Sequence, residues 1–364
     1  MFVFFSTPRC YNIANNLNMK NMKTRSLALL ICNTSIIAMV LVPFTFMVNV
    51  PEAQAATITA YCDGTAASPV VPTDAPGGSE LDEGSWTTSD DVTFLNGNND
   101  GYCLLDKEIN VASVTIGNGL ADGSDYAFLT HAGAGWDNDP TAGFDMQGVL
   151  ISTSGNFTIY AGNGINVDEK GCQGASGSNG FGPNEFNVCT VDTAGYGGGA
   201  AGVSLRSGSG AGHGGAGGDG DAALGPSYEL NANGSTYGSS TVPVLFGSSS
   251  GGFTSTTGGD GGGLVKLVIG GGFTFNGSVS ANGANGPGAS NQGVGGGGGG
   301  SVDIAVTGAL SGSTGALSAD GGDGYDGAGY DGGGGGGGRI ALTYGVNSFT
   351  SYGSGVFAVA GGAG

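Results

Sequence analysis

The chain has 364 residues, and 80 of them are glycine, which is about threefold the usual share. It carries 29 acidic and 9 basic residues, a formal net charge of −20. A surface this acidic repels polyanions, so the composition excludes nucleic-acid binding and favours the binding of cations.

Residues 1–55 have the features of an export signal. A basic segment at 20–25 precedes a mostly apolar stretch at 27–48, and the tripeptide at 53–55 (Ala-Gln-Ala) fits a small–x–small cleavage site. Cleavage there removes four bases and one acid, leaving 5 bases (9 − 4) and 28 acids (29 − 1). An uncleaved stretch would instead be a membrane anchor, the one membrane contact that the sequence predicts.

Translation from Met19 or Met22 would place the basic segment at the start of this signal. Cys10 and Cys32 then lie outside the exported part.

The four remaining cysteines are an even set in an exported chain, which favours disulfides. Three pairings are open to Cys62, Cys103, Cys172 and Cys189. The local pairing joins Cys62 to Cys103 and Cys172 to Cys189. The second of these bonds closes a short loop and is worth about 3 kcal/mol. Free buried thiols are the alternative.

Residues 56–147 predict an N-terminal β region that caps a longer structure. Short strand patterns at 92–95 and 111–116 end at turn sequences, Asn96-Gly97 and 117–119 (Gly-Asn-Gly). A cap is expected because the end of a stack of strands otherwise exposes a bare edge.

Residues 148–364 carry a repeat in which a glycine run precedes an alternating apolar strand. The strands are at 264–269, 301–306 and 339–344, and Val265, Val302 and Ile340 share one column. The next two columns are Leu267, Ile304, Leu342 and Ile269, Val306, Tyr344. The spacing is 37 or 38 residues (302 − 265 and 340 − 302). A fixed period of this size predicts an all-β solenoid, a parallel β-helix in which each repeat buries its apolar face against its neighbours.

Each repeat also holds a second strand, at 273–281, 310–319 and 356–359, which places Leu317 over Val279. A looser copy comes earlier, with strands at 149–151, 157–159 and 165–167. Residues 171–260 are less regular and hold a compressed copy at 203–205 with insertions around Tyr228 and 242–246.

The glycine runs at 295–300 and 332–338 allow two interpretations. They are flexible surface loops, or they are left-handed threads with three residues per turn whose amides pair with neighbouring threads. Residues 361–364 match 321–324, where a glycine arm starts, so we expect the chain to be a fragment of a longer protein.

The repeat resembles exported glycine-rich repeat proteins of bacteria and archaea. The shared phrase is Ala-Asn-Gly or Ala-Asp-Gly-Gly, then a glycine tract and Gly-Gly-Gly-Arg-Ile, found here at 281–283, 319–322 and 332–340. The resemblance implies an adhesin-type, pectin-lyase-like right-handed parallel β-helix, with arms similar to polyglycine II, at a cell surface. It implies no activity and no functional residue.

Few residues suggest catalysis. His131 and His213 lie in glycine-rich surroundings without a nucleophile pattern, which argues against a catalytic triad or a zinc site. A polysaccharide hydrolase would need paired carboxylates. The candidate pairs are Asp219 with Asp221, Asp90 with Asp91, and Asp323 with Asp326. We expect them to be solvated turn residues, and we predict no catalytic residue and no cofactor.

If the chain binds a metal ion, the sequence predicts that the ion is calcium. Residues 321–326 fit the start of a Gly-Gly-x-Gly-x-Asp nonapeptide, in which Asp323 and Asp326 would be the ligands.

The sequence thus predicts a secreted or cell-surface, non-catalytic structural protein of the adhesin type. It would bind a cell-envelope or extracellular polysaccharide or protein, or itself, through extended repeat surfaces. One alternative is a polysaccharide-degrading β-helix enzyme with paired aspartates. Another is a glycine-thread module that binds ice or a receptor through a flat face.

Overall fold

The chain divides into two units, Met1–Gln54 and Ala55–Gly364. The computed structural model describes residues 55–97, 101–119, 126–133, 148–174, 176–184, 187–191, 197–202, 207–221, 234–253, 255–288, 293–327, 330–350 and 357–364. All of them belong to the second unit. The predicted export signal lies outside the described residues, except for Ala55.

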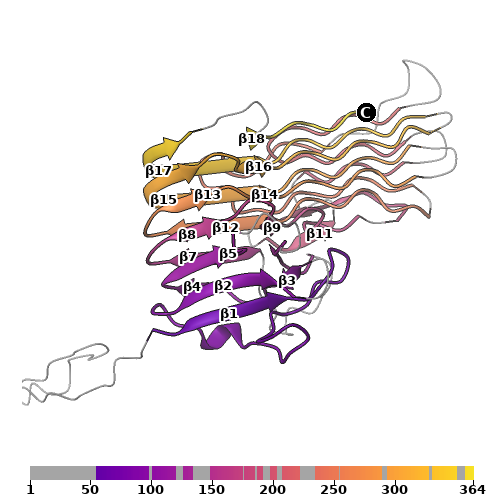
Figure 1. Ribbon diagram of the computed structural model, residues 1–364. Helices are drawn as coiled ribbons and strands as arrows, with labels where there is room; N and C mark the ends of the chain where they lie inside the picture. The colour runs from indigo at the N-terminus through magenta and orange to yellow at the C-terminus, as the bar shows by residue number, and fades with distance from the viewer. Residues whose placement is uncertain are drawn as a thin grey trace, which may run out of the picture. The chain divides into compact units, whose positions relative to one another are not determined.

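The described part is all-β, and its strands stack in parallel from layer to layer (Figure 1). One face holds β1 (Thr57–Cys62), β2 (Asp91–Asn96), β5 (Ser113–Ile116), β8 (Phe157–Ile159) and β13 (Phe273–Phe275). A second face holds β4 (Ile109–Val111), β7 (Val149–Thr153) and β12 (Leu264–Ile269). A third holds β3 (Tyr102–Leu104), β6 (Phe128–Thr130), β9 (Gly164–Asn166), β14 (Ser278–Ser280), β16 (Ala316–Ser318) and β18 (Phe357–Ala358).

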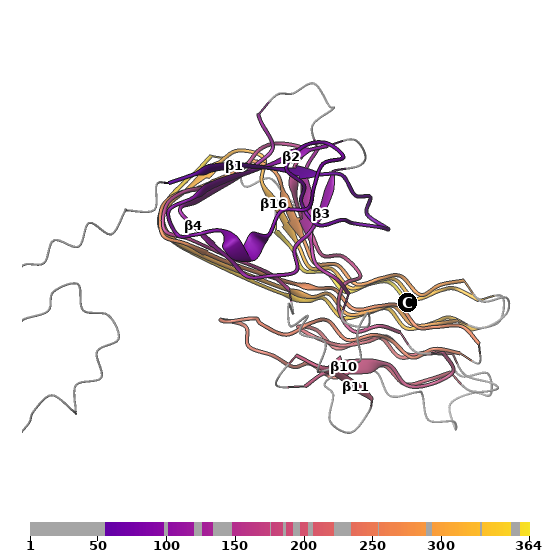
Figure 2. The same cartoon turned by 90° about the horizontal axis from the view of Figure 1, so that it is seen from below.

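Two long strands join the first two faces into one curled sheet. The first part of β15 (Ser301–Gly312) pairs with β12, and its last part pairs with β13. β17 (Arg339–Phe349) pairs along β15 in the same way, with a shift between Val306 and Ala309. Figure 2 looks along the stack and shows the strands enclosing a common interior.

The register is the one that the repeat predicts. Val265 pairs with Val302 and Val302 with Ile340, and the other two apolar columns pair likewise. On the third face, Val279 pairs with Leu317. The parallel all-β architecture and its register are therefore confirmed.

The earlier, looser copy belongs to the same stack. β7 pairs with β12 and β8 with β13, although more than a hundred residues separate them in the sequence. Between them in the chain, β9 stays in the stack on the third face, whereas β10 (Phe181–Pro183) pairs antiparallel with β11 (Cys189–Val191) in a separate sheet. Residues 203–205 and Tyr228 lie outside the described residues, and residues 242–246 form no strand.

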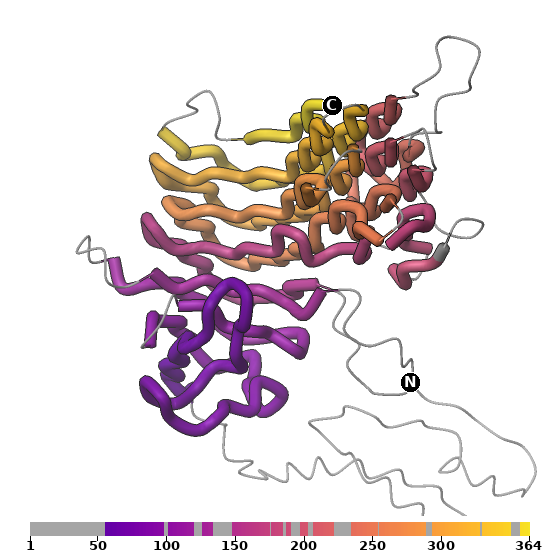
Figure 3. Tube along the Cα trace, turned by 90° about the vertical axis from the view of Figure 1, so that its right-hand side faces the viewer, coloured from indigo at the N-terminus to yellow at the C-terminus, as the bar shows by residue number. Residues whose placement is uncertain are grey.

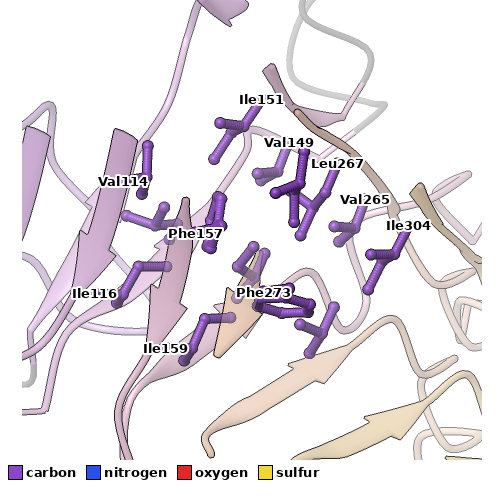
Figure 4. Close-up of a cluster of buried hydrophobic side chains, with 14 of the residues drawn as sticks. Val114, Ile116, Val149, Ile151, Phe157, Ile159, Val265, Leu267, Phe273 and Ile304 are labelled. Carbon is purple, nitrogen blue, oxygen red and sulfur yellow. The ribbon is translucent and has the colours of Figure 1, made fainter. Parts of the chain in front are cut away.

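The core is a continuous column of inward-facing apolar side chains (Figure 4). Phe157 meets Phe273 edge-on at 5.6 Å between ring centroids, and Phe273 stacks on Phe275 at 5.0 Å. Each layer buries its apolar residues against the layers on either side, which is why one repeat cannot be stable by itself.

Three of the predicted strands are split in the structure. The pattern at 111–116 is split at Ala112 into β4 and β5, and the patterns at 273–281 and 310–319 are each split by a turn. The chain changes face at these points, and alternation of apolar residues continues across a corner, so the sequence pattern does not mark it.

The first layer is covered by the residues around β1. A short 3₁₀ helix (Glu83–Ser85) and the flanking Leu81 and Trp86 lie over the core, with Trp86 5.9 Å from Phe94 between ring centroids. In the layer of β17, Ile340 and Leu342 are half-buried and Tyr344 is 43% exposed.

Candidate functional site

The glycine-rich arms leave the stack beside the third face and pack against one another (Figure 3). We call this part the glycine bundle. Its members are residues 197–202, 207–221, 234–253, 258–263, 281–288, 293–300, 319–324, 332–338 and 359–364. Figure 1 shows the arms running side by side away from the strands.

Hydrogen bonds in the bundle repeat every third residue. The Gly296 and Gly299 amides donate to the Gly333 and Gly336 carbonyls of one neighbouring arm, each at 2.9 Å. The amides next to them turn to other arms. Gly297 and Gly300 donate to Ala284 and Ala281, and Gly298 donates to Ser248. An arm thus pairs with three neighbours in turn, so the arms are ordered.

Glycine is required here because the arms approach too closely for a side chain. A methyl group at Gly297 would overlap the Asp260 carbonyl oxygen, and one at Gly335 would overlap the Gly297 carbonyl oxygen. No glycine of 293–300 or 332–338 has a positive φ, so backbone handedness is not the reason for glycine in these arms.

Where the arms begin, side-chain oxygens form a ladder between layers. The Asn282 amide donates to Asp168 Oδ1 at 2.7 Å, and the Asp320 amide donates to Asn282 Oδ1 at 2.8 Å. The Ala360 amide continues the ladder to Asp320 Oδ1 at 2.6 Å. Burial raises the pKa of Asp168, with a smaller contribution from the negative charge of Asp320.

A second ladder runs three residues further along each arm. The Asp323 amide donates to Asn285 Oδ1 at 2.8 Å, and the Ala363 amide donates to Asp323 Oδ1 at 2.7 Å. The recurring Ala-Asn-Gly and Ala-Asp-Gly phrase contains Asn282 and Asp320 of the first ladder, but the role of these residues as interlayer acceptors became visible only in the structure.

The expectation that the carboxylate pairs are solvated turn residues is wrong for one pair, because Asp90 is buried and Asp91 lies in β2. Asp90 accepts hydrogen bonds from the Ala56 and Thr87 amides at 3.0 and 2.7 Å, which lower its pKa. Asp91 accepts one from Ser113 Oγ. Asp219 and Asp221 are exposed on the bundle, and the Asp221 amide donates to the Asp331 carbonyl.

Asp323 and Asp326, the predicted calcium ligands, are both exposed on the same arm. Asp323 takes part in the second ladder, and Asp326 forms an isolated backbone bridge with Asp331. Within the described residues, no three histidine, cysteine, aspartate or glutamate side chains gather as metal ligands would. Calcium binding stays a prediction.

Two disulfides join the cysteines in the local pairing, Cys62 with Cys103 and Cys172 with Cys189. The first links β1 to β3 in the covered end of the stack. The second lies beside Phe246 and Leu264, where the bundle meets β12. Two disulfides favour an oxidising compartment outside the cytoplasm.

A column of hydroxyl groups runs up the outer side of the first face. Paired residues of successive layers form it: Thr59, Thr93, Thr115, Thr158, Thr274, Ser311 and Ser348. All are half-exposed or exposed, and parallel strands repeat about every 4.8 Å. The hydroxyl column could not be predicted from the sequence, because most of its members come from layers with irregular spacing along the chain.

No known protein family, curated protein or solved structure matches this chain. In the part of the chain that the structure describes, no helix is long and apolar enough to cross a membrane.

Proposed function

We propose that this chain is a secreted or cell-surface structural protein of the adhesin type, which binds through extended repeat surfaces and does not catalyse a reaction. Its architecture would be a right-handed parallel β-helix with polyglycine II-like arms. Right-handed crossovers are favoured because nearly all connections between parallel strands have this hand. Pairing with three neighbours at a three-residue repeat supports polyglycine II, since left-handed threads with three residues per turn direct successive amides to different sides.

The two side-chain ladders are the observation that carries this proposal. Asp168, Asp320 and Asp323 direct a carboxylate oxygen at the backbone of the next layer. These groups hold the layers in register, so their role is structural. The repeated outer faces are what the molecule presents to a partner.

The partner would be an extended polymer that contacts several layers at once, either a polysaccharide or protein of the cell envelope or matrix, or another copy of the chain. Weak contacts repeated at a fixed spacing add up, so binding should strengthen steeply with polymer length. The acidic surface argues against nucleic acids and acidic glycans as partners.

Binding to immobilised neutral polysaccharides, acidic polysaccharides and matrix proteins tests the proposal, with release of reducing ends followed in the same wells. We expect saturable binding to at least one neutral polymer or protein, affinity that grows with chain length, and no released sugar. Sugar release that Asp219→Asn or Asp323→Asn abolishes would instead establish the hydrolase alternative. Asp323→Asn keeps the ladder acceptor, so it separates catalysis from folding.

The hydroxyl column favours a second candidate, a flat face that binds a regular lattice such as ice or a repetitive receptor. Strand residues form this face, whereas the sequence suggested that glycine threads would form the flat binding face. Thr115→Lys and Thr158→Lys would place charged side chains in the column without changing the core. Thermal hysteresis in the unmodified chain that these variants lose would support this candidate, and its absence at high protein concentration would remove it.

A further inference from the structure

We propose that His131 and His213 form an acid-sensitive latch, which fastens the glycine bundle to the stacked strands at neutral pH and opens when the imidazoles are protonated. These are the two histidines of the chain. Both are fully buried. His131 lies where the bundle meets the start of β12, and His213 lies inside the bundle against Tyr237, which Arg339 of β17 contacts.

His213 lies inside the bundle, and one of its two ring nitrogens makes a hydrogen bond there. Its Nδ1 donates to the Gly299 carbonyl oxygen at 2.6 Å, which makes Nε2 the unprotonated nitrogen. That Nε2 is buried and has no hydrogen-bond partner among the described residues. The ring stacks on Tyr237 with 4.5 Å between centroids. The backbone of Gly299 and Gly300 favours a charged ring, but burial outweighs it and Arg339 adds to the effect of burial, so a second proton is disfavoured in the closed state.

His131 lies where β6 ends, and its Nε2, unlike that of His213, accepts a hydrogen bond. Its Nδ1 donates to the Ala132 carbonyl oxygen at 2.6 Å, and its Nε2 faces the Leu264 amide at 3.4 Å, at the first residue of β12. Its ring stacks on Phe246 with 5.6 Å between centroids. Protonation would turn Nε2 into a donor that faces another donor.

One segment of the bundle connects the two rings. Tyr237 Oη donates to the Phe246 carbonyl oxygen at 2.5 Å and accepts from Ser248 Oγ at 2.9 Å. Arg339, the first residue of β17, donates from Nε to the Tyr237 carbonyl oxygen at 2.8 Å. Residues 237–248 are thus held by His213 and Arg339 at one end and by His131 at the other.

The charged groups that act on the two rings are cationic. Lys170 acts on His131 and Arg339 acts on His213, while the Tyr237 phenol is kept neutral by a pKa that burial raises. Burial is the largest cause that lowers the pKa of each histidine to about 4, and the nearby cation adds to it.

The direction of the pH effect follows from the burial of the two rings and from the cations beside them. A histidine whose pKa is lower in the closed state than in the open state binds its proton on opening, so acid favours opening. Closure is complete above the ordinary pKa of 6.5 and weakens as the pH falls toward 4. Each histidine should raise the opening equilibrium by roughly tenfold to a hundredfold between pH 7 and pH 4.

Hydrogen exchange of the full exported chain, corrected for intrinsic rates, tests the latch. We expect residues 207–215 and 237–248 to lose protection at least tenfold between pH 7 and pH 4, while β12 to β14 keep theirs. The double variant His131→Gln, His213→Gln should remove this difference, because glutamine can donate and accept but does not titrate in this range. Glu83→Gln, at the covered end of the stack, should leave it unchanged.

An NMR titration of the two imidazole C–H signals keeps the test independent of how the variants fold. Both should titrate below pH 5 in the unmodified chain. Ordinary titration near pH 6.5, equal protection of the two segments at both pH values, or a pH effect that survives in the double variant would overturn the proposal.

Discussion

At the level of single residues, glycine has two separate uses in this chain. Gly117 and Gly119 adopt positive φ at a turn, where other residues are strained. Gly297 and Gly335 do not, and they are glycine because a neighbouring carbonyl occupies the place of a side chain. The second use depends on the packing of arms that are distant in sequence.

The loss of stability when a glycine of the bundle is replaced should therefore depend on the space around the added methyl group. Gly297→Ala would force apart two arms and should lower the free energy of unfolding by about 1–3 kcal/mol, as overpacking does. Gly215→Ala is the matched control, because the nearest atom to its methyl group, the Gly337 amide nitrogen, is 3.4 Å away. Urea unfolding of both variants measures the difference, and equal losses would contradict this explanation.

Glu83 gives a pH dependence of opposite sign to that of the histidines. Burial raises its pKa from 4.5 to about 9, with further upward contributions from Asp106. An acid whose pKa rises on folding takes up a proton, so its contribution to stability is complete below pH 4.5 and is lost as the pH rises toward 9.

Glu83→Gln keeps the neutral form at every pH. We expect it to stabilise the chain at pH 8 relative to the unmodified protein, by about 1–3 kcal/mol, and to change little at pH 5. Denaturant midpoints at the two pH values check this, and a gain of equal size at both would show that charge is not the cause.

At the level of elements, the side-chain ladders set which residue lies over which. Asn282 lies between Asp168 and Asp320, so the middle rung is neutral and the two carboxylates are kept apart. Like charges on adjacent strands destabilise a sheet, which explains an amide at the middle position.

Two substitutions of Asn282, the middle rung, separate the contribution of its hydrogen bond to stability from the effect of charge. Asn282→Ala removes one acceptor and should cost about 1 kcal/mol at any pH. Asn282→Asp keeps the acceptor but stacks three carboxylates, so it should destabilise the chain at pH 7 and low salt, with the loss relieved by salt or by pH 3. Thermal unfolding across salt and pH measures both, and a salt-independent loss in Asn282→Asp would rule out charge repulsion.

At the level of the whole molecule, the two disulfides stabilise different regions. Cys62–Cys103 ties the covered end of the stack, whereas Cys172–Cys189 ties the junction between the bundle and β12. Their separate positions predict that reduction loosens the covered end of the stack and the junction between the bundle and β12 independently.

Removing either disulfide by a paired Cys→Ala change should cost about 2–4 kcal/mol. Loss of Cys172–Cys189 should lower hydrogen-exchange protection mainly in residues 171–191 and 246–264, and loss of Cys62–Cys103 mainly in 57–104. Uniform loss of protection throughout the stack in both variants would show that these regions unfold only together.

The sequence by itself determined the layers. A period of 37 or 38 residues specifies which apolar side chains meet, so the pairing of Val265, Val302 and Ile340 could be predicted. The local cysteine pairing, one of three that the sequence left open, is the pairing that the structure shows. These features could be predicted because side chains of distinct size and polarity mark each position along the chain.

Only the tertiary structure decided how the glycine arms pair and where the histidines lie. Glycine amides are chemically identical, so no side chain marks which of three neighbours each one meets. The partners of Gly296–Gly300 come from arms throughout the second half of the chain. The burial of His131 and His213 follows from that packing, because isolated histidines among glycines look solvent-exposed until the arms close around them.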